Sequence, residues 1–167
     1  MKNLLPCSLM LLLAGCATTP PEVAKDQDVT AEFRSRIEKI LAGWSTLDIK
    51  NVAPYYAKDA GLVFFDVAPL KYSGWAEYEK GFQQVSATWK SIKLALGDFQ
   101  ATRSGNIVWA VYTSPIEIEP KVGPVMKAVT RATDIFERRG DDWIIVHEHV
   151  SAPFEPPQPP AADAKKK

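Results

Sequence analysis

Cysteine and histidine are both scarce in this chain. It has two cysteines in 167 residues, Cys7 and Cys16, and two histidines, His147 and His149. Both cysteines lie near the N-terminus, which excludes a disulfide framework and a cysteine nucleophile inside the folded part. The common metal centres need more His and Cys ligands than this chain offers. We therefore expect no metal and no cofactor.

The chain also lacks an excess of charge of either sign. Its 20 basic side chains balance its 20 acidic ones, and no basic stripe able to neutralise several phosphates stands out, so a nucleic-acid partner is not expected. With 46% apolar and 24% charged residues, the composition is that of one ordinary globular domain.

No hydrophobic run is long enough to span a bilayer. Residues 4–14 are apolar but short, and Pro6 and Ser8 interrupt them. Lys2 precedes this segment, and Leu13-Ala14-Gly15-Cys16 ends it. The pattern resembles the lipobox of bacterial lipoproteins, which implies cleavage before Cys16 and a lipid on that residue. A secretory signal without lipid is the alternative.

The same resemblance implies a location in the bacterial cell envelope. Ala17, rather than Asp, follows the cysteine, which points to the outer membrane with the domain facing the periplasm. We assign residues 1–15 to a signal peptide and residues 16–28 to a tether. Residues 153–167 are rich in proline and lysine and are expected to form a disordered tail. The folded domain is then 29–152.

Apolar periodicity predicts helices in the first half of this domain. Positions 33, 37, 40, 41, 44 and 47 repeat at steps of three and four, which predicts a helix of about 18 residues capped by Thr30. A short helix is expected to begin near Asn51 and a third one after Ser73. A short strand, residues 61–65, separates these two helices.

From Trp89 onward the period changes to two, which predicts strands. Long strands are expected at 107–118, 125–138 and 143–150, separated by turns at Gly105, Gly123 and Gly140. Helices followed by an antiparallel meander indicate an α+β fold in which one curved antiparallel sheet wraps around a long N-terminal helix.

This order of elements resembles the SnoaL-like branch of the nuclear transport factor 2-like superfamily. The most specific pieces are residues 131–140 and the closing segment Trp143–Ser151, which also resembles the end of the association domain of calcium/calmodulin-dependent kinase. The resemblance implies a cone whose open end admits a ligand, and it makes a homodimer an expected state. Because the superfamily includes isomerases, dehydratases, cyclases and non-catalytic modules, it does not assign a function.

Strand alternation indicates one candidate catalytic pair. If the last strand alternates regularly, Trp143, His147 and His149 share a face and Glu148 points the other way. Counting back across the Gly140 turn places Asp134 opposite His147, where a carboxylate would tune the imidazole for acid/base work. A purely structural polar cluster explains the same residues. A metal site would lack a third ligand.

Aromatic residues indicate a candidate pocket. The side chains expected near it are Trp44, Tyr55, Tyr56, Trp75, Tyr78, Trp109 and Tyr112. Of these, Tyr56, Trp75 and Tyr112 are candidate ligand-binding residues together with His149, because buried polar tips need partners. Resemblance to ketosteroid isomerases adds Asp66 as a possible base. The first helix has Ile40 or Leu41 where those enzymes place an oxyanion-binding Tyr, which disfavours steroid isomerisation.

Three functions are compatible with these residues. The first is a non-catalytic module that binds an unidentified small molecule at the envelope. The second is an acid/base enzyme of isomerase or dehydratase type that uses Asp134 and His147. The third is a homo-oligomeric assembly domain whose sheet packs on a second copy. We favour the first.

Overall fold

The structure is a computed structural model that describes residues 26–154. The predicted signal peptide, Cys16 and the tail beyond residue 154 lie outside the described residues. Within residues 26–154, no helix has the length and apolar character needed to cross a membrane. The part of the chain that is described is the predicted domain with a few flanking residues.

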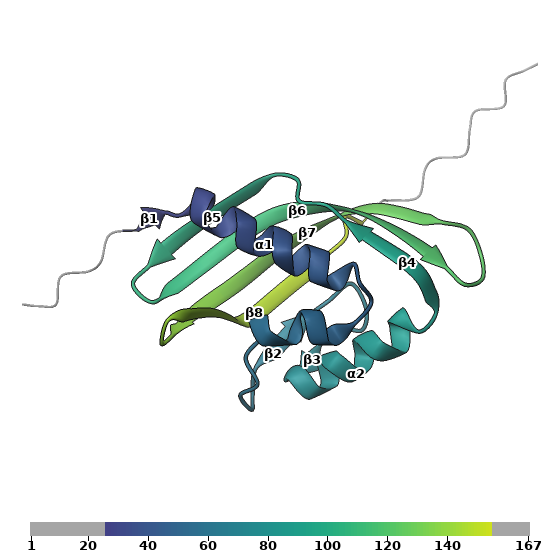
Figure 1. The fold of residues 1–167 in the computed structure, drawn as a ribbon, viewed down its shortest axis with the longest axis horizontal. Helices are drawn as coiled ribbons and strands as arrows, with labels where there is room; N and C mark the ends of the chain where they lie inside the picture. Colours follow the sequence, from purple (N-terminus) through teal and green to yellow (C-terminus); the bar gives the residue numbers. More distant parts are fainter. Residues whose placement is uncertain (1–25, 155–167) are drawn as a thin grey trace, which may run out of the picture.

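The elements follow the predicted order, helices first and long strands last (Figure 1). They are β1 (Gln27–Asp28), α1 (Thr30–Trp44), η1 (Ile49–Asn51), η2 (Ala53–Tyr55), β2 (Val63–Phe65), β3 (Tyr72–Ser73), α2 (Trp75–Ser86), β4 (Trp89–Leu94), β5 (Phe99–Ser104), β6 (Ile107–Pro120), β7 (Met126–Arg139) and β8 (Asp142–Ser151).

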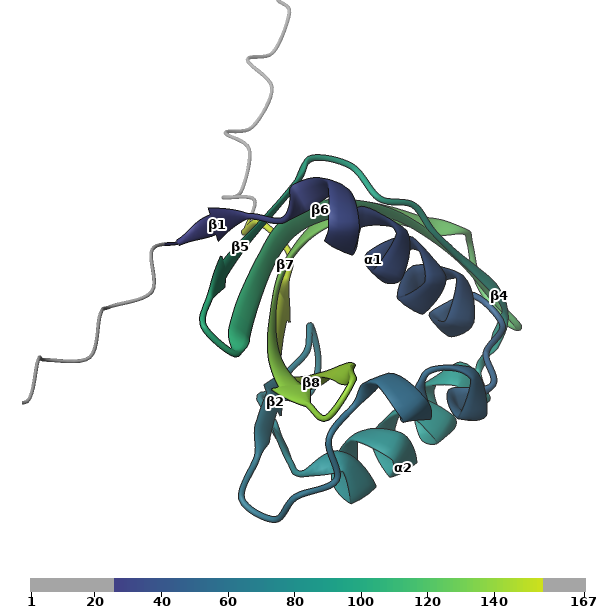
Figure 2. The same cartoon turned by 60° about the vertical axis from the view of Figure 1, so that its left-hand side comes forward.

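One curved sheet wraps around α1, and α2 with the two 3₁₀ turns lies across the open side (Figure 2). The strand order is β1-β5-β6-β7-β8-β2-β3, and β4 pairs with β6. The sheet is mixed rather than wholly antiparallel, because β2 runs parallel to β8. The expected α+β cone is confirmed with that one correction.

The apolar face of α1 fills the middle of the cone. Its buried residues include Phe33, Ile37 and Ile40, as the periodicity predicts. Thr30 is the first residue of the helix rather than its cap; its backbone N–H donates to the Asp28 carboxylate at 2.9 Å. Asp28 belongs to β1, so the end of the predicted tether is part of the sheet.

The other predicted helix starts need similar corrections. The predicted second helix is a pair of 3₁₀ turns. Pro54 lies in the second turn, and Tyr56, directly after it, has an extended backbone, so no α-helix continues. Gly74, at φ 82°, precedes the third helix, and Ser73 ends β3 instead of capping. Residues 89–104, where the period of two begins, form two strands, β4 and β5.

A β-bulge in β8 decides which of its side chains enter the cone. Phe136 pairs with Ile145, but Ile135 pairs with His147, so Val146 is an extra residue on β8. Such an extra residue breaks the alternation of faces. Ile145 and Glu148 are therefore both buried although they are three residues apart.

Candidate functional site

Glu148 lies at the centre of a buried cluster of polar side chains. Its carboxylate accepts hydrogen bonds of 2.5 Å from the hydroxyl groups of Tyr56 and Tyr78. Tyr56 in turn accepts a hydrogen bond from the indole N–H of Trp44 at 3.2 Å. These side chains come from α1, the end of η2, α2 and β8, so the cluster connects the helices to the sheet.

A second buried carboxyl group lies beside the first. Asp134 of β7 pairs directly with Glu148 across the two strands. The Tyr112 hydroxyl of β6 donates to Asp134 Oδ2 at 3.1 Å. The other oxygen, Oδ1, is buried and receives no hydrogen bond from the described residues. Two acidic groups thus share one interior site with exposed fractions of 0% for Asp134 and 3% for Glu148.

Burial shifts the acid/base behaviour of this pair. It raises the pKa of Glu148 to about 7, although the hydrogen bonds from Tyr56 and Tyr78 favour the ionised form. Burial and the nearby charge of Glu148 raise the pKa of Asp134 well above its ordinary value. Because two adjacent buried carboxylates repel each other, the pair retains a proton near neutral pH, and Asp134 is the better place for it.

The hydroxyl groups of the cluster stay protonated. Burial, followed by the nearby carboxylates, raises the pKa values of Tyr56, Tyr78 and Tyr112 well above the ordinary tyrosine value. They act as hydrogen-bond donors and not as bases at any ordinary pH.

Aromatic rings surround the acidic pair on its helical side. Tyr56 contacts Trp75 with ring centres 4.9 Å apart, and Tyr78 stacks on Tyr72 at the same distance. Trp44 contacts both Tyr56 and Tyr78 at 5.8 and 5.5 Å. On the outer side of Trp75, the Lys58 ammonium lies 3.4 Å from the ring centre.

Asp66 connects this interior with the surface. It follows β2, burial raises its pKa, and its charge contributes to the raised pKa of Glu148. It also lines an open depression of about 400 Å³ whose other residues include Phe65, Leu70 and His149. Asp66 therefore lies where a molecule from the solvent could approach Glu148.

The predicted pairing of Asp134 with His147 is wrong. Asp134 does face the interior, as the count from Gly140 predicted, but the bulge places Glu148 opposite it. His147 instead donates from Nδ1 to the Val63 carbonyl at 2.7 Å and packs edge-on against Phe65. The histidine is thus held by β2 on the outer side of the sheet.

Two further residues lie away from the interior. His149 is exposed and packs against Phe65, at the rim of the depression that Asp66 also lines. Trp109 is half-buried and alternates with the buried Val108 and Ala110, so it faces the outside of the sheet and does not line the cone.

The structure therefore brings together six of the predicted residues: Trp44, Tyr56, Trp75, Tyr78, Tyr112 and Asp134. Glu148, the central acid, was not predicted to face the interior. One signal was present, because four consecutive apolar residues, 143–146, break the expected alternation. Such an interruption is typical of a bulge.

Among residues 26–154, no group of three or more His, Cys, Asp or Glu side chains is arranged to hold a metal ion.

A second open depression, of about 470 Å³, lies across β5, β6 and β7 and includes Arg131 and Thr133. Its lining also includes Tyr112, whose hydroxyl donates to Asp134, but it does not include Glu148.

Sequence comparison identifies one family. Residues 33–155 match the profile of the SnoaL-like domain. None of the curated proteins is similar enough in sequence to count as a match.

Solved structures show the same fold. A nuclear transport factor 2-like protein of unknown function from Pseudomonas putida KT2440 is 24% identical, with 75% of this chain and 87% of that one covered and a TM-score of 0.64. A superfamily member from Salmonella enterica serovar Typhimurium is 15% identical, with coverages of 82% and 96% and a TM-score of 0.69. A candidate dehydratase from Streptomyces avermitilis is 18% identical, with coverages of 75% and 96% and a TM-score of 0.66.

Proposed function

Because this chain belongs to the SnoaL-like domain family, we propose that it is a binding protein whose cone holds a small, partly apolar molecule against Asp134 and Glu148. The observation that carries the proposal is the enclosed acidic pair: no donor of another side chain reaches Asp134 Oδ1, so it has no partner once the proton that Asp134 and Glu148 share is lost. Buried acceptors of this kind are costly unless something satisfies them. A ligand donor would do so.

The aromatic surroundings suit the apolar part of such a molecule. The rings of Trp44 and Trp75 pack on Tyr56, whose hydroxyl donates to Glu148. Ligand sites are commonly lined by apolar and aromatic side chains with a few polar groups that fix orientation. Because both acids are fully enclosed, a ligand must displace some of this packing, and the depression that Asp66 lines is one open approach.

Binding is favoured over catalysis because the tyrosine hydroxyl groups of the cluster already donate to the two acids. Acid/base enzymes that form an oxyanion need donors directed at the substrate oxygen. Here Tyr56 and Tyr78 already donate to Glu148, and Tyr112 donates to Asp134. No tyrosine of the cluster is left to stabilise a developing negative charge.

Native mass spectrometry of the purified full-length protein tests this proposal. We expect a small molecule to be retained by the wild type and lost from Glu148→Gln. Glu38→Gln, an exposed change on α1, is the matched control and should retain it. The proposal fails if no small molecule is retained and none of a chemically diverse set raises the melting temperature.

An acid/base enzyme is the second candidate, with Glu148 in place of His147 as the partner of Asp134. It is favoured by the pKa of Glu148 of about 7, which leaves the group half ionised at neutral pH. Chemical change of the retained molecule by the wild type but not by Glu148→Gln would support this alternative.

We further propose that the protein is anchored in the cell envelope through a lipid on Cys16.

We also propose that the protein acts as a homodimer. The outer face of the sheet supports the dimer, because Val111 and Val129 are exposed there with exposed fractions of 40% and 52%. Analytical ultracentrifugation of the wild type and of Val129→Lys tests it. A monomeric wild type would contradict it.

A further inference from the structure

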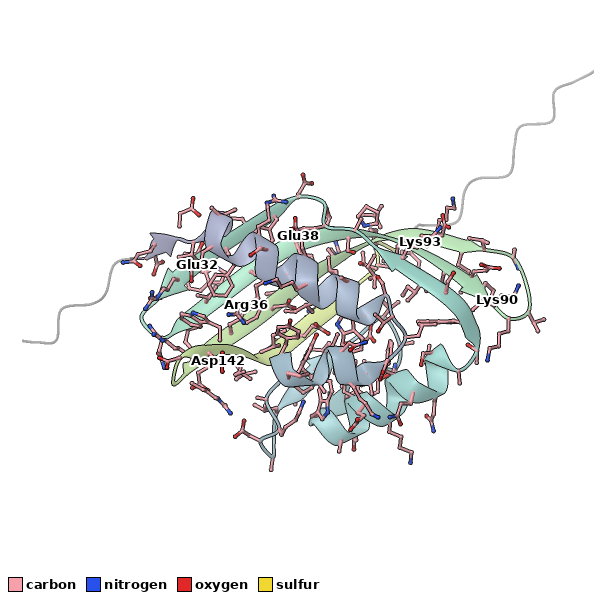
Figure 3. The ribbon with its side chains drawn as sticks, in the orientation of Figure 1. Glu32, Arg36, Glu38, Lys90, Lys93 and Asp142 are labelled. Carbon is pink, nitrogen blue, oxygen red and sulfur yellow. The ribbon has the colours of Figure 1, made fainter. Side chains whose placement is uncertain are left out.

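The interior of the cone holds acids without a basic partner. The charge of Glu148 acts on Asp134 and the charge of Asp66 acts on Glu148, and no lysine, arginine or histidine is among the main influences on their pKa values. The ion pairs of residues 26–154 involve other side chains. Lys90 and Lys93, for example, lie on β4 at the surface (Figure 3). Any negative charge on the pair is therefore uncompensated.

Every hydrogen-bond donor of the interior cluster is already paired, so the cluster has an excess of acceptors. The four donors that reach the cluster, Trp44 and three tyrosines, already donate to an acceptor within it. When the proton shared by the two acids is lost, the group left without a donor is Asp134 Oδ1. A molecule that fits this site must bring its own donor, and a carboxylate or phosphate would meet only acceptors and negative charge.

Aromatic faces beside the acids add a second preference for positive charge. A ring attracts a cation to its face, especially where water is excluded. Trp75 already shows this behaviour toward Lys58, whose ammonium lies over its outer face. Trp44, Tyr56 and Tyr78 offer further rings on the inner side.

From these observations we infer that the ligand of the cone is an organic amine, whose ammonium group lies between Asp134 and Glu148 and whose apolar part packs on Trp44 and Tyr56. This inference rests on the proposed binding function and specifies its ligand class. The ammonium would supply the missing donor to Asp134 Oδ1 and the missing countercharge to Glu148. It would also take the place of the proton that the two acids share.

This replacement makes binding depend on pH. An ammonium binds best when the pair has lost its proton, so affinity should increase as the pH rises toward 8. The other titratable groups facing the pair are Tyr56, Tyr78 and Tyr112, which stay protonated, and Asp66, whose charge favours a cation further. Tyr72 stacks on Tyr78 and also stays protonated.

Benzylamine, benzyl alcohol and benzoate, which have similar shape and different charge, provide the test. Their binding to the full-length protein is measured by isothermal titration calorimetry at pH 6 and pH 8, in two buffers that differ in ionisation enthalpy. We expect benzylamine to bind at least tenfold more tightly than benzyl alcohol at pH 8, with proton release, and this preference to shrink at pH 6. Benzoate should bind most weakly.

Variants assign the effect to the acids. Asp134→Asn and Glu148→Gln should each abolish the preference for the amine while benzyl alcohol still binds. Trp109→Phe, on the outside of the sheet, is the control and should change nothing. Melting curves identify a variant that fails to fold, and the pH dependence of the wild type then decides alone.

The outcomes separate the two proposals. If benzyl alcohol or benzoate binds as tightly as benzylamine at pH 8, the amine inference is overturned and the binding function stands. If none of the three probes binds and no small molecule is retained on purification, the binding function fails and the inference fails with it.

Discussion

Asp134 and Glu148 lie directly opposite each other on β7 and β8, and both side chains point into the cone. Strand neighbours with like charge destabilise a sheet when both are ionised. This pair persists because a raised pKa keeps a proton in the site near neutral pH.

The first prediction is that the protein loses stability between pH 5 and pH 8. The pKa of Glu148 is about 7 in the fold against an ordinary value of 4.5, so the folded state binds more protons than the unfolded state in this range. The free energy of unfolding therefore falls as the pH rises above about 4.5, and the loss is complete above about 7. A pKa difference of this size corresponds to roughly 3 kcal/mol.

Chemical denaturation of the wild type and Glu148→Gln at several pH values measures the effect. The slope with pH should be smaller in the variant, and Glu38→Gln should behave as the wild type. A wild type that is more stable at pH 8 than at pH 5 would contradict the buried pair.

The second prediction concerns the tyrosine donors. Tyr56→Phe removes a hydrogen bond that favours the ionised form of Glu148, so the pKa of Glu148 should rise further above about 7. Carbon-detected NMR titration of the carboxyl groups measures it. Tyr55→Phe, one residue earlier, is the control; an equal effect in both variants would mean that the hydroxyl contact is not the cause.

The third prediction concerns Trp143, near the start of β8 in the last hairpin. Its ring packs edge-on against Phe33 at 5.5 Å and is 7% exposed. Trp143→Ala should lower the free energy of unfolding by about 3–5 kcal/mol, as large-to-small core changes do. Denaturant titration measures it, and a loss below about 1 kcal/mol would argue against this packing.

The fourth prediction concerns the contact of α2 with β3. A Cβ at Gly81 would collide with the ring of Tyr72, which is stacked on Tyr78. Gly81→Ala should therefore destabilise by about 1–3 kcal/mol, even though alanine ordinarily favours a helix over glycine by about 1 kcal/mol. A more stable variant in thermal melts would show that Tyr72 moves aside freely.

The fifth prediction concerns the anchor. Cys16→Ser should move the protein from the membrane fraction to the soluble fraction of the cell envelope, because no acyl chain can then be attached. Cys7→Ser is the matched control and should stay with the membrane. If both variants stay there, the lipobox interpretation is wrong.

Much of the fold follows from short-range periodicity. Phe33, Ile37 and Ile40 share a helical face that has to be buried, and Gly140, at φ 64°, fixes the last hairpin. The side of the sheet on which Asp134 lies could be derived by counting from that turn. The parallel contact of β2 with β8 could not, because it depends on tertiary packing between distant segments.

The central residue of the site could not be derived by the same counting. Alternation fails at Val146, and every residue beyond it changes face relative to the regular pattern. His147 and His149 were therefore assigned to the interior in place of Glu148. Counting was not needed to find Tyr56, Trp75 and Tyr112. A large aromatic side chain with a polar tip indicates an interior contact whatever the register of its strand or helix.

The bulge in β8 also affects how site residues are transferred between homologous chains. In a relative whose last strand is regular, the position facing the interior after the equivalent of Ile145 comes two residues later, whereas here it comes three residues later. An alignment without a gap at Val146 would equate His147, which faces outward here, with an interior-facing position of such a relative. Equivalent site residues in this family therefore have to be assigned by superposition of strands and not by position in the sequence.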